Sequence, residues 1–396
     1  MMAKLGDYIS IKHGFAFKGK GITTDDNGIV LVTPGNFAIG GGFKEEKCKF
    51  FDGEYPSEYV LSPDDLIVTM TDLSKEMDTL GYSALVPLSN RIYLHNQRIG
   101  LISINSEEID KHYLYWFMRT KKYQRTIAGG ASGTTVHHTS PSRICDVIVE
   151  FPNKFTQKKI ASILDDIEEK MKRNEEINEN LLQQARALFR KWFSITSSGL
   201  YKLSDIADIN PETYSPKENW SFVNYLDTSN ITSGTINEVQ YIIPSEGKLP
   251  SRARRILRKD DVVFSTVRPN QLHYGIISNP KPNMLGSTGF AVIRSKYETM
   301  PNEIIYLALT ESAFVEQMQQ LAEQSVSTFP SIRPADLDAC VLPEPKEDDN
   351  NFMETIKSIF NAVAINNEEN QRLATLRDTL LPRLMSGELD VSSLDF

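Results

Sequence analysis

Basic and amide side chains gather in a few short segments of this sequence. Positive charge along a stripe can neutralise phosphates, and arginine, asparagine or glutamine on exposed loops can read the edges of bases. The candidate contacts in the first half are Lys12, His13, Lys18, Lys20, Asn36, Asn96, Gln97, Arg119, Lys121, Lys122 and Arg125. Those in the second half are Arg252, Arg254, Arg255, Arg258, Lys259, Arg268, Asn270, Gln271 and His273. The pattern favours a nucleic-acid interface. Because each residue type is also common on ordinary surfaces, the pattern does not determine which of these residues contact the nucleic acid.

The net charge of −9 at pH 7 would argue against such an interface if the charge were evenly spread. The acidic residues are instead concentrated in one long segment, which contains Asp165, Asp166, Glu168, Glu169, Glu175 and Glu176. We expect that segment to face solvent or a protein partner rather than nucleic acid.

Several enzyme motifs are nearly present, but each lacks a group that its chemistry needs. Residues 14–21 resemble a phosphate-binding loop, yet Gly21 stands where the hydroxyl that holds Mg²⁺ should be. Residues 210–214 lack the second proline and the adjacent aromatic of the Asn-Pro-Pro-Tyr motif of amino-methyltransferases. His137 and His138 have no third ligand at metal spacing. We therefore expect no catalysis, no cofactor and no metal in this chain.

The composition indicates a folded protein of two or three domains, because 396 residues are 40% hydrophobic. The three cysteines lie far apart without a C-x-x-C pair, which excludes a disulfide framework or a zinc ribbon. We expect neither a signal peptide nor a membrane-spanning helix, since no run of about 18 apolar residues occurs.

Two long segments without Gly or Pro carry the same apolar repeat. Steps of four and three through residues 155–193 give Ile160, Leu164, Ile167, Met171, Asn174, Asn178, Leu181, Ala185, Leu188 and Trp192. The second series lies 192 residues later at every step: Phe352, Ile356, Ile359, Val363, Asn366, Asn370, Leu373, Arg377, Leu380 and Leu384. Each series predicts a long helix with a coiled-coil seam, and their agreement indicates an internal duplication.

The paired asparagines at the middle of each seam predict how the helices pack. Buried amides must pair with each other, which favours one register. In an antiparallel pair, Asn174 and Asn178 would lie near Asn366 and Asn370. The alternative is that these four side chains are simply solvated.

The remaining segments also match, so we divide the chain into globule (1–152), helix (153–195), globule (196–345), and helix with tail (346–396). Both globules have a doubled aspartate before an apolar strand, at Asp64-Asp65 and Asp260-Asp261. The expected later elements are strands at 99–104 and 290–293, helices at 111–119 and 302–311, polar loops at 131–138 and 324–331, and final strands ending at 152 and 345.

The two helical segments resemble those of type I restriction–modification specificity subunits. The similarity lies in the strings at 155–165 and 187–193 and, most specifically, in the tail at 376–389. The resemblance implies an α+β fold: two mixed α/β target recognition domains, joined by two long helices in an antiparallel coiled coil, as a pseudo-two-fold internal repeat. It also implies that polar loops contact DNA through Thr134, Thr135, His137 and His138 in the first domain and Ser327 and Thr328 in the second.

The implied role is to choose the DNA site for a complex, with each domain reading half of a bipartite, asymmetric duplex site. Two methyltransferase subunits using S-adenosylmethionine, and restriction subunits using ATP and Mg²⁺, would supply the chemistry. The outer helix faces and residues 380–389 would dock the methyltransferases. Such a chain would be cytoplasmic, in a bacterium or archaeon, and nucleoid-associated through DNA. Three alternatives remain: a methylation-only complex, a DNA-independent coiled-coil scaffold, and an enzyme that acts alone.

Overall fold

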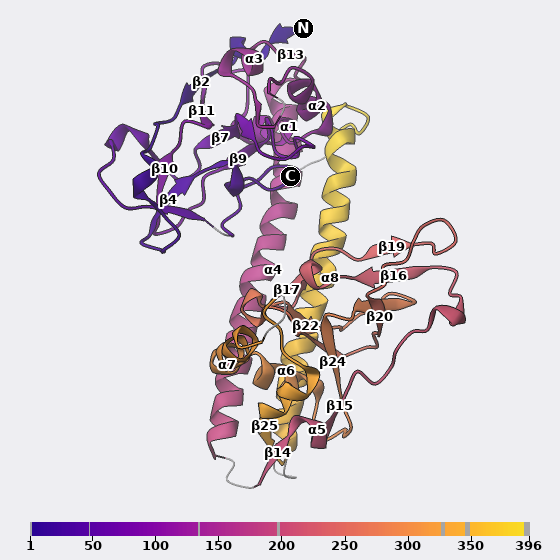
Figure 1. Cartoon of the computed structure of the whole chain (residues 1–396). Helices are drawn as coiled ribbons and strands as arrows, with labels where there is room; N and C mark the ends of the chain where they lie inside the picture. The colour runs from indigo at the N-terminus through magenta and orange to yellow at the C-terminus, as the bar shows by residue number, and fades with distance from the viewer. Residues whose placement is uncertain are drawn as a thin grey trace. The chain divides into compact units, whose positions relative to one another are not determined.

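The computed structural model describes residues 2–46, 48–133, 135–195, 199–325, 329–344 and 349–391. It forms two compact units, each containing one globule and parts of both long helices (Figure 1). Unit 1 comprises Met1–Met171 and Gln371–Phe396, and unit 2 comprises Lys172–Asn370. The helices are α4 (Lys154–Ile195) and α8 (Asn350–Met385).

Unit 1 contains two main sheets that share an apolar core. The antiparallel four-stranded sheet has the order β2 (Ile9–His13), β11 (Ile99–Ile104), β7 (Leu66–Thr69) and β9 (Ser83–Leu85). The five-stranded sheet has the order β3 (Ile22–Thr23), β5 (Lys49–Phe51), β4 (Ile29–Val32), β10 (Ile92–His95) and β6 (Val60–Leu61), in which only β4 and β10 are parallel. Ile67 and Ile99 from the first sheet pack with Val30 and Tyr93 from the second.

Short helices join the four-stranded sheet of unit 1 to the long helices. They are α1 (Lys111–Phe117), α2 (Lys121–Gly129) and α3 (Pro141–Cys145). Trp116 of α1, Leu164 of α4 and Leu384 of α8 belong to one buried cluster. Two small ladders complete the unit: β1 (Ala3–Lys4) with β13 (Ile148–Val149), and β8 (Thr71–Asp72) with β12 (His137–His138).

Unit 2 repeats this plan, with four strands in its second sheet where unit 1 has five. Its first sheet has the order β15 (Ala207–Ile209), β24 (Phe290–Ser295), β21 (Val262–Ser265) and β22 (Tyr274–Ile276). Its second has β19 (Gln240–Ile242), β16 (Val223–Leu226), β23 (Met284–Ser287) and β20 (Ala253–Ile256), with β16 and β23 parallel. The other elements are β14 (Leu200–Lys202) paired with β25 (Val341–Pro343), β17 (Ile231–Thr232) paired with β18 (Thr235–Ile236), α5 (Leu203–Ile206), α6 (Asn302–Leu309) and α7 (Ser312–Glu323).

The duplication extends to single backbone torsions. Asp64 and Asp260 adopt the same left-handed conformation, with φ of 67° and 64°, directly before the equivalent strands β7 and β21. A left-handed residue of this kind makes a tight turn, and aspartate tolerates it better than bulkier residues do. The predicted mixed α/β fold and internal repeat are therefore confirmed.

The long helices pack antiparallel in unit 2, where they lie side by side (Figure 1). Asn174 donates to Asn370 at 2.8 Å and Asn366 donates to Asn178 at 2.8 Å. One residue number falls as the other rises, so the helices run in opposite directions. The predicted pairing of amides is confirmed, and their solvated alternative is wrong.

One predicted seam position is wrong. Leu188 is 36% exposed, whereas its neighbour Phe189 is buried and packs with Trp192 and α6. A straight helix turns once in 3.6 residues, so a 3.5-residue repeat drifts away from the true inner face. Here the helix end packs on the globule of its own unit, and Phe189 faces that core.

Within the described part of the chain, no helix combines the length and apolarity needed to cross a membrane.

Candidate nucleic-acid interface

One edge of the four-stranded sheet in unit 1 brings distant polar segments together. Here β2 ends, β11 begins and β7 ends, and the backbone N–H of Met70 donates to Arg98 O at 2.9 Å. The N–H of Thr139 then donates to Met70 O at 3.0 Å. We call residues 12–14, 70–72, 96–98 and 137–139 the loop edge of unit 1. Because strand ends meet there, four separate parts of the sequence lie together, with 70–72 buried beneath the other three.

The loop edge of unit 1 contains several of the predicted contacts. Lys12, His13, Gln97 and His138 are exposed there, and the His138 Nδ1 lies 3.1 Å from a threonine hydroxyl in β8. Asn96 and His137 are half-buried, and the carbonyl oxygen of the Asn96 side chain accepts from the backbone N–H of Arg98 at 3.0 Å.

Sequence analysis missed Arg98, an exposed cation beside Asn96 and Gln97 at this edge. A lone arginine next to two amides carried no charge run to reveal it. Arg98 reaches this edge because the 95–99 turn lies beside the end of β7, a contact between segments that are distant in sequence.

A second basic group lies on α2. Lys121, Lys122 and Arg125 are exposed, and so is Thr135 in the polar loop. The Gln124 side chain donates to Met77 O at 2.7 Å, which fastens α2 to the segment that follows β8. The structure thus connects this basic helix to the segment that follows the loop edge in sequence. Thr134 lies outside the described residues.

Two predicted DNA contacts are wrong, because their side chains are buried. Asn36 is 1% exposed and uses its amide to close a turn, accepting from the N–H of Thr33 at 2.8 Å. Arg119 is 6% exposed and forms an ion pair with Glu168 of α4 at 2.7 Å. Sequence shows that these side chains are polar, but only packing shows that they point inward.

Lys18 and Lys20 are exposed in the segment that leads from the loop edge to β3. The segment that carries them continues into β3, and Gly21 O accepts from Asp52 N just beyond β5. That point is at the Ile92 end of the sheet, whereas the 96–98 turn follows the other end of β10.

Unit 2 forms the equivalent loop edge with the same backbone bonds. Thr266 N donates to Gly289 O at 2.8 Å, and Ile332 N donates to Thr266 O at 2.9 Å. Thr288 N also donates to Arg252 O at 2.8 Å, which brings exposed Arg252 to this edge. We define the loop edge of unit 2 as residues 252, 266–271, 287–289 and 330–332.

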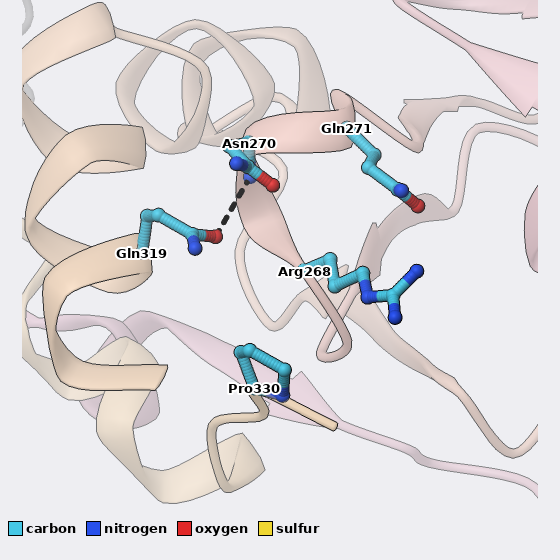
Figure 2. A pocket seen from close by; sticks show the side chains of 5 residues that line it. All are labelled: Arg268, Asn270, Gln271, Gln319 and Pro330. Atoms are coloured by element: carbon cyan, nitrogen blue, oxygen red, sulfur yellow. Dashed lines mark hydrogen bonds between the residues drawn. The ribbon is translucent and has the colours of Figure 1, made fainter. Parts of the chain in front are cut away.

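A short 3-10 turn, η7 (Pro269–Gln271), carries two predicted contacts at this edge, and Arg268 directly precedes it. Arg268, Asn270 and Gln271 are exposed and line a shallow pocket together with Gln319 and Pro330 (Figure 2). Predicted contacts Ser327 and Thr328 lie outside the described residues.

The remaining basic residues of unit 2 are placed differently. Arg258 lies before β21, at the end opposite to η7, and pairs with Glu212 at 2.7 Å. Hydrogen bonds from Arg258 and Arg294 lower the pKa of Glu212 to about 2, so the carboxylate stays charged and the pair is structural. Lys259 is exposed at the same end.

Three further candidates in unit 2 are half-buried. Arg254 donates to Ser251 O at 3.1 Å, and His273 Nδ1 lies 2.6 Å from Ile231 O. The Nε of Arg255 is buried without a hydrogen-bond partner among the described residues. None of the three is as available to a ligand as the residues of η7.

Among the residues that the structure describes, no three His, Cys, Asp or Glu side chains gather as a group that could hold a metal ion.

Comparison with known proteins identifies the first half of the chain. Residues 1–183 match the model of the type I restriction modification DNA specificity domain. This part of the chain is therefore similar to the specificity domain of that family. The resemblance inferred from the two helical segments is therefore confirmed.

Relatives of this specificity domain extend the similarity to most of the chain. The specificity subunit of the type I restriction enzyme HindI from Haemophilus influenzae is 23% identical over 382 residues, covering 75% of this chain and 81% of that protein. That of MjaIX from Methanocaldococcus jannaschii is 23% identical over 315 residues, covering 74% and 72%. The crystal structure of a type I S subunit from M. genitalium shares the fold, with a TM-score of 0.58 and 16% identity over 97% of this chain and 95% of that one.

Proposed function

We propose that this chain is the subunit that recognises DNA sequence in a type I restriction–modification complex. Its two globules would each read one half of a bipartite duplex site. The observation that carries this proposal is the repeated loop edge. The four-stranded sheets β2-β11-β7-β9 and β15-β24-β21-β22 share one strand order and the same hydrogen bonds at the same corner. Two similar binding surfaces in one chain suit two half-sites on one duplex.

The two loop edges carry different side chains, which supports an asymmetric site. Lys12, His13 and Gln97 lie in unit 1, whereas Arg268 and Gln271 lie in unit 2. Base edges are distinguished by the pattern of donors and acceptors that the protein presents. Different side chains on equivalent backbones would therefore select different half-sites.

Catalysis belongs to partner subunits in this proposal. Two methyltransferase subunits would bind S-adenosylmethionine and modify adenine, and restriction subunits would use ATP and Mg²⁺. An adenine must leave the stack to be methylated, so the bound duplex would be distorted. The curated relatives named as specificity subunits support this division of labour.

The decisive experiment is methylome sequencing of a methylation-deficient host. The host would carry this chain together with its neighbouring methyltransferase gene, and two control hosts would carry either gene alone. A new divided motif that appears only with both genes supports the proposal. Co-purification of the two proteins without any new motif would refute DNA reading and leave the scaffold alternative.

The salt dependence of binding gives an independent measurement. Each neutralised phosphate releases condensed counterions, so the logarithm of affinity should fall linearly with the logarithm of salt concentration. A scaffold that does not bind DNA would show no such slope. Adding the restriction subunit and testing for cleavage of unmodified DNA then separates full restriction from a methylation-only complex.

A further inference from the structure

The η7 turn of unit 2 presents polar groups that nothing in the described structure uses. The guanidinium of Arg268 forms no ion pair, and the side-chain amides of Asn270 and Gln271 form no hydrogen bonds, within the described residues. All three side chains are exposed. Their hydrogen-bonding capacity is therefore available to a ligand.

The backbone of this turn is held in place from both sides. Arg268 N donates to Pro330 O at 3.0 Å, and Asn270 N donates to Gln319 Oε1 of α7 at 3.2 Å. Arg268 and Leu272 adopt left-handed conformations with φ of 48° and 58°, which cost energy for residues other than glycine. Such strain persists where surrounding contacts enforce it, as they do at many binding sites.

The Arg268 side chain is also positioned. Its Cζ lies 5.1 Å from the centre of the Phe329 ring, a distance suited to a cation–π interaction. This contact limits the freedom of the guanidinium without using its N–H groups in an ion pair. Figure 2 shows Arg268 and Gln271 extending toward the same side of the turn.

We infer that this turn enters the major groove and reads two bases of one half-site, Arg268 binding guanine and Gln271 binding an adjoining adenine. The inference rests on the function proposed above. An arginine fork matches the O6 and N7 acceptors of guanine, and a glutamine amide matches N6 and N7 of adenine. Phosphate binding needs only nearby positive charge, whereas base reading needs fixed donors of the kind that this turn supplies.

Unit 1 cannot read a guanine in the same way. Equivalent hydroxyl bonds, Thr69 Oγ1 to Thr71 O at 2.9 Å and Ser265 Oγ to Val267 O at 2.8 Å, align Asp72 with Arg268. Asp72 is 3% exposed and accepts from Thr79 N at 2.6 Å, so it is occupied within its own loop. A guanine read from this position therefore belongs to one half-site alone.

The test uses the complete complex and compares wild type with Arg268→Ala and Arg268→Lys. Lys281→Ala is the control, because Lys281 is an exposed cation before β23, whose opposite end reaches the loop edge. Methylome sequencing gives the motif of each variant. Competition binding then uses duplexes with each of the four bases at every guanine of the wild-type motif.

We expect wild type and Lys281→Ala to prefer guanine at one position of one half-site by about 5- to 150-fold. Both Arg268 variants should lose that preference, although lysine restores the charge, and should keep the other half-site unchanged. The matched Gln271→Ala variant should lose an adenine preference at an adjoining position. Thermal unfolding and co-purification with the methyltransferase verify that each variant is folded.

The results separate this inference from the proposed function. An unchanged motif in both Arg268 variants, with affinity reduced equally for all duplexes, would make Arg268 a phosphate contact and overturn the inference. A wild-type complex without any divided motif would instead refute the proposed function itself.

Discussion

Replacing Arg119 with methionine tests whether this arginine serves the fold or contacts DNA. In unit 1 its guanidinium pairs with Glu168 at 2.7 Å, donates to Gly40 O at 3.0 Å and lies 4.3 Å from the centre of the Trp116 ring. Methionine keeps much of the aliphatic volume but removes every donor. The change would leave the Glu168 carboxylate without its cation.

The size of the effect follows from burial. Breaking a buried ion pair costs about 3–5 kcal/mol because one charge loses its partner. The Glu168 side chain is still 37% exposed, so water partly replaces the arginine. We therefore expect Arg119→Met to lower the free energy of unfolding by about 2–3 kcal/mol. In a unit of about 200 residues, this corresponds to a fall in Tm of about 5–10 °C.

Calorimetry measures this change, and Arg125→Met is the matched control. Arg125 is exposed on the next helix, so its replacement should alter stability by less than about 0.5 kcal/mol. Adding Glu168→Gln to Arg119→Met should recover part of the loss, since it removes the unpaired carboxylate. Wild-type stability in Arg119→Met, combined with weaker DNA binding, would refute our reasoning and restore Arg119 as a DNA contact.

Three further predictions concern the helices and the loop edge. Gly14→Ala should destabilise unit 1 by about 1–3 kcal/mol in denaturant unfolding, because its Cβ would lie 2.3 Å from a backbone oxygen, whereas Gly19→Ala meets nothing within 4 Å and should not. His112 lies 2.8 Å from Asp165, whose hydrogen bond raises the pKa of His112. The free energy of unfolding of wild type should therefore exceed that of His112→Gln most below about pH 6.5. This excess should decline as the pH rises through the raised pKa of His112, and a difference that does not depend on pH would contradict the prediction. Asn178→Leu should lower stability in thermal unfolding, because it removes the hydrogen bonds that the buried Asn178 amide makes with Asn366 and Asn367 of α8, and unchanged stability would argue against the amide pairing.

Periodic features of this chain could be predicted because they repeat locally. The apolar steps predicted both long helices, and their polar interruptions correctly placed Asn174 and Asn178 near Asn366 and Asn370. The doubled aspartates marked the turns before β7 and β21. Each feature depends on residues close together in sequence, where backbone geometry and side-chain period act directly.

The candidate interface could be predicted only in part, because it is made by contacts between distant segments. Sequence showed charge at Arg258, but its pairing with Glu212 arises 46 residues away. It likewise gave no sign that the 96–98 turn would lie beside Met70. Polar composition identifies residues able to bind a ligand, whereas tertiary packing decides which of them already have partners.

Under the proposed function, the two loop edges would let one duplicated fold read two different sequences. The hydroxyls of Thr69 and Ser265 close the same local turn in both units, so the backbone of this turn does not depend on the side chain that follows it. At the next equivalent position, Asp72 turns inward and binds its own loop, whereas Arg268 projects outward. The hydrogen bonds that shape the turn come from the backbone and from small hydroxyls. The side chain that differs between the two units follows directly after them. Under the proposed function, substitution at such a position would change specificity at little cost to stability, and the two halves of the protein could diverge toward different half-sites.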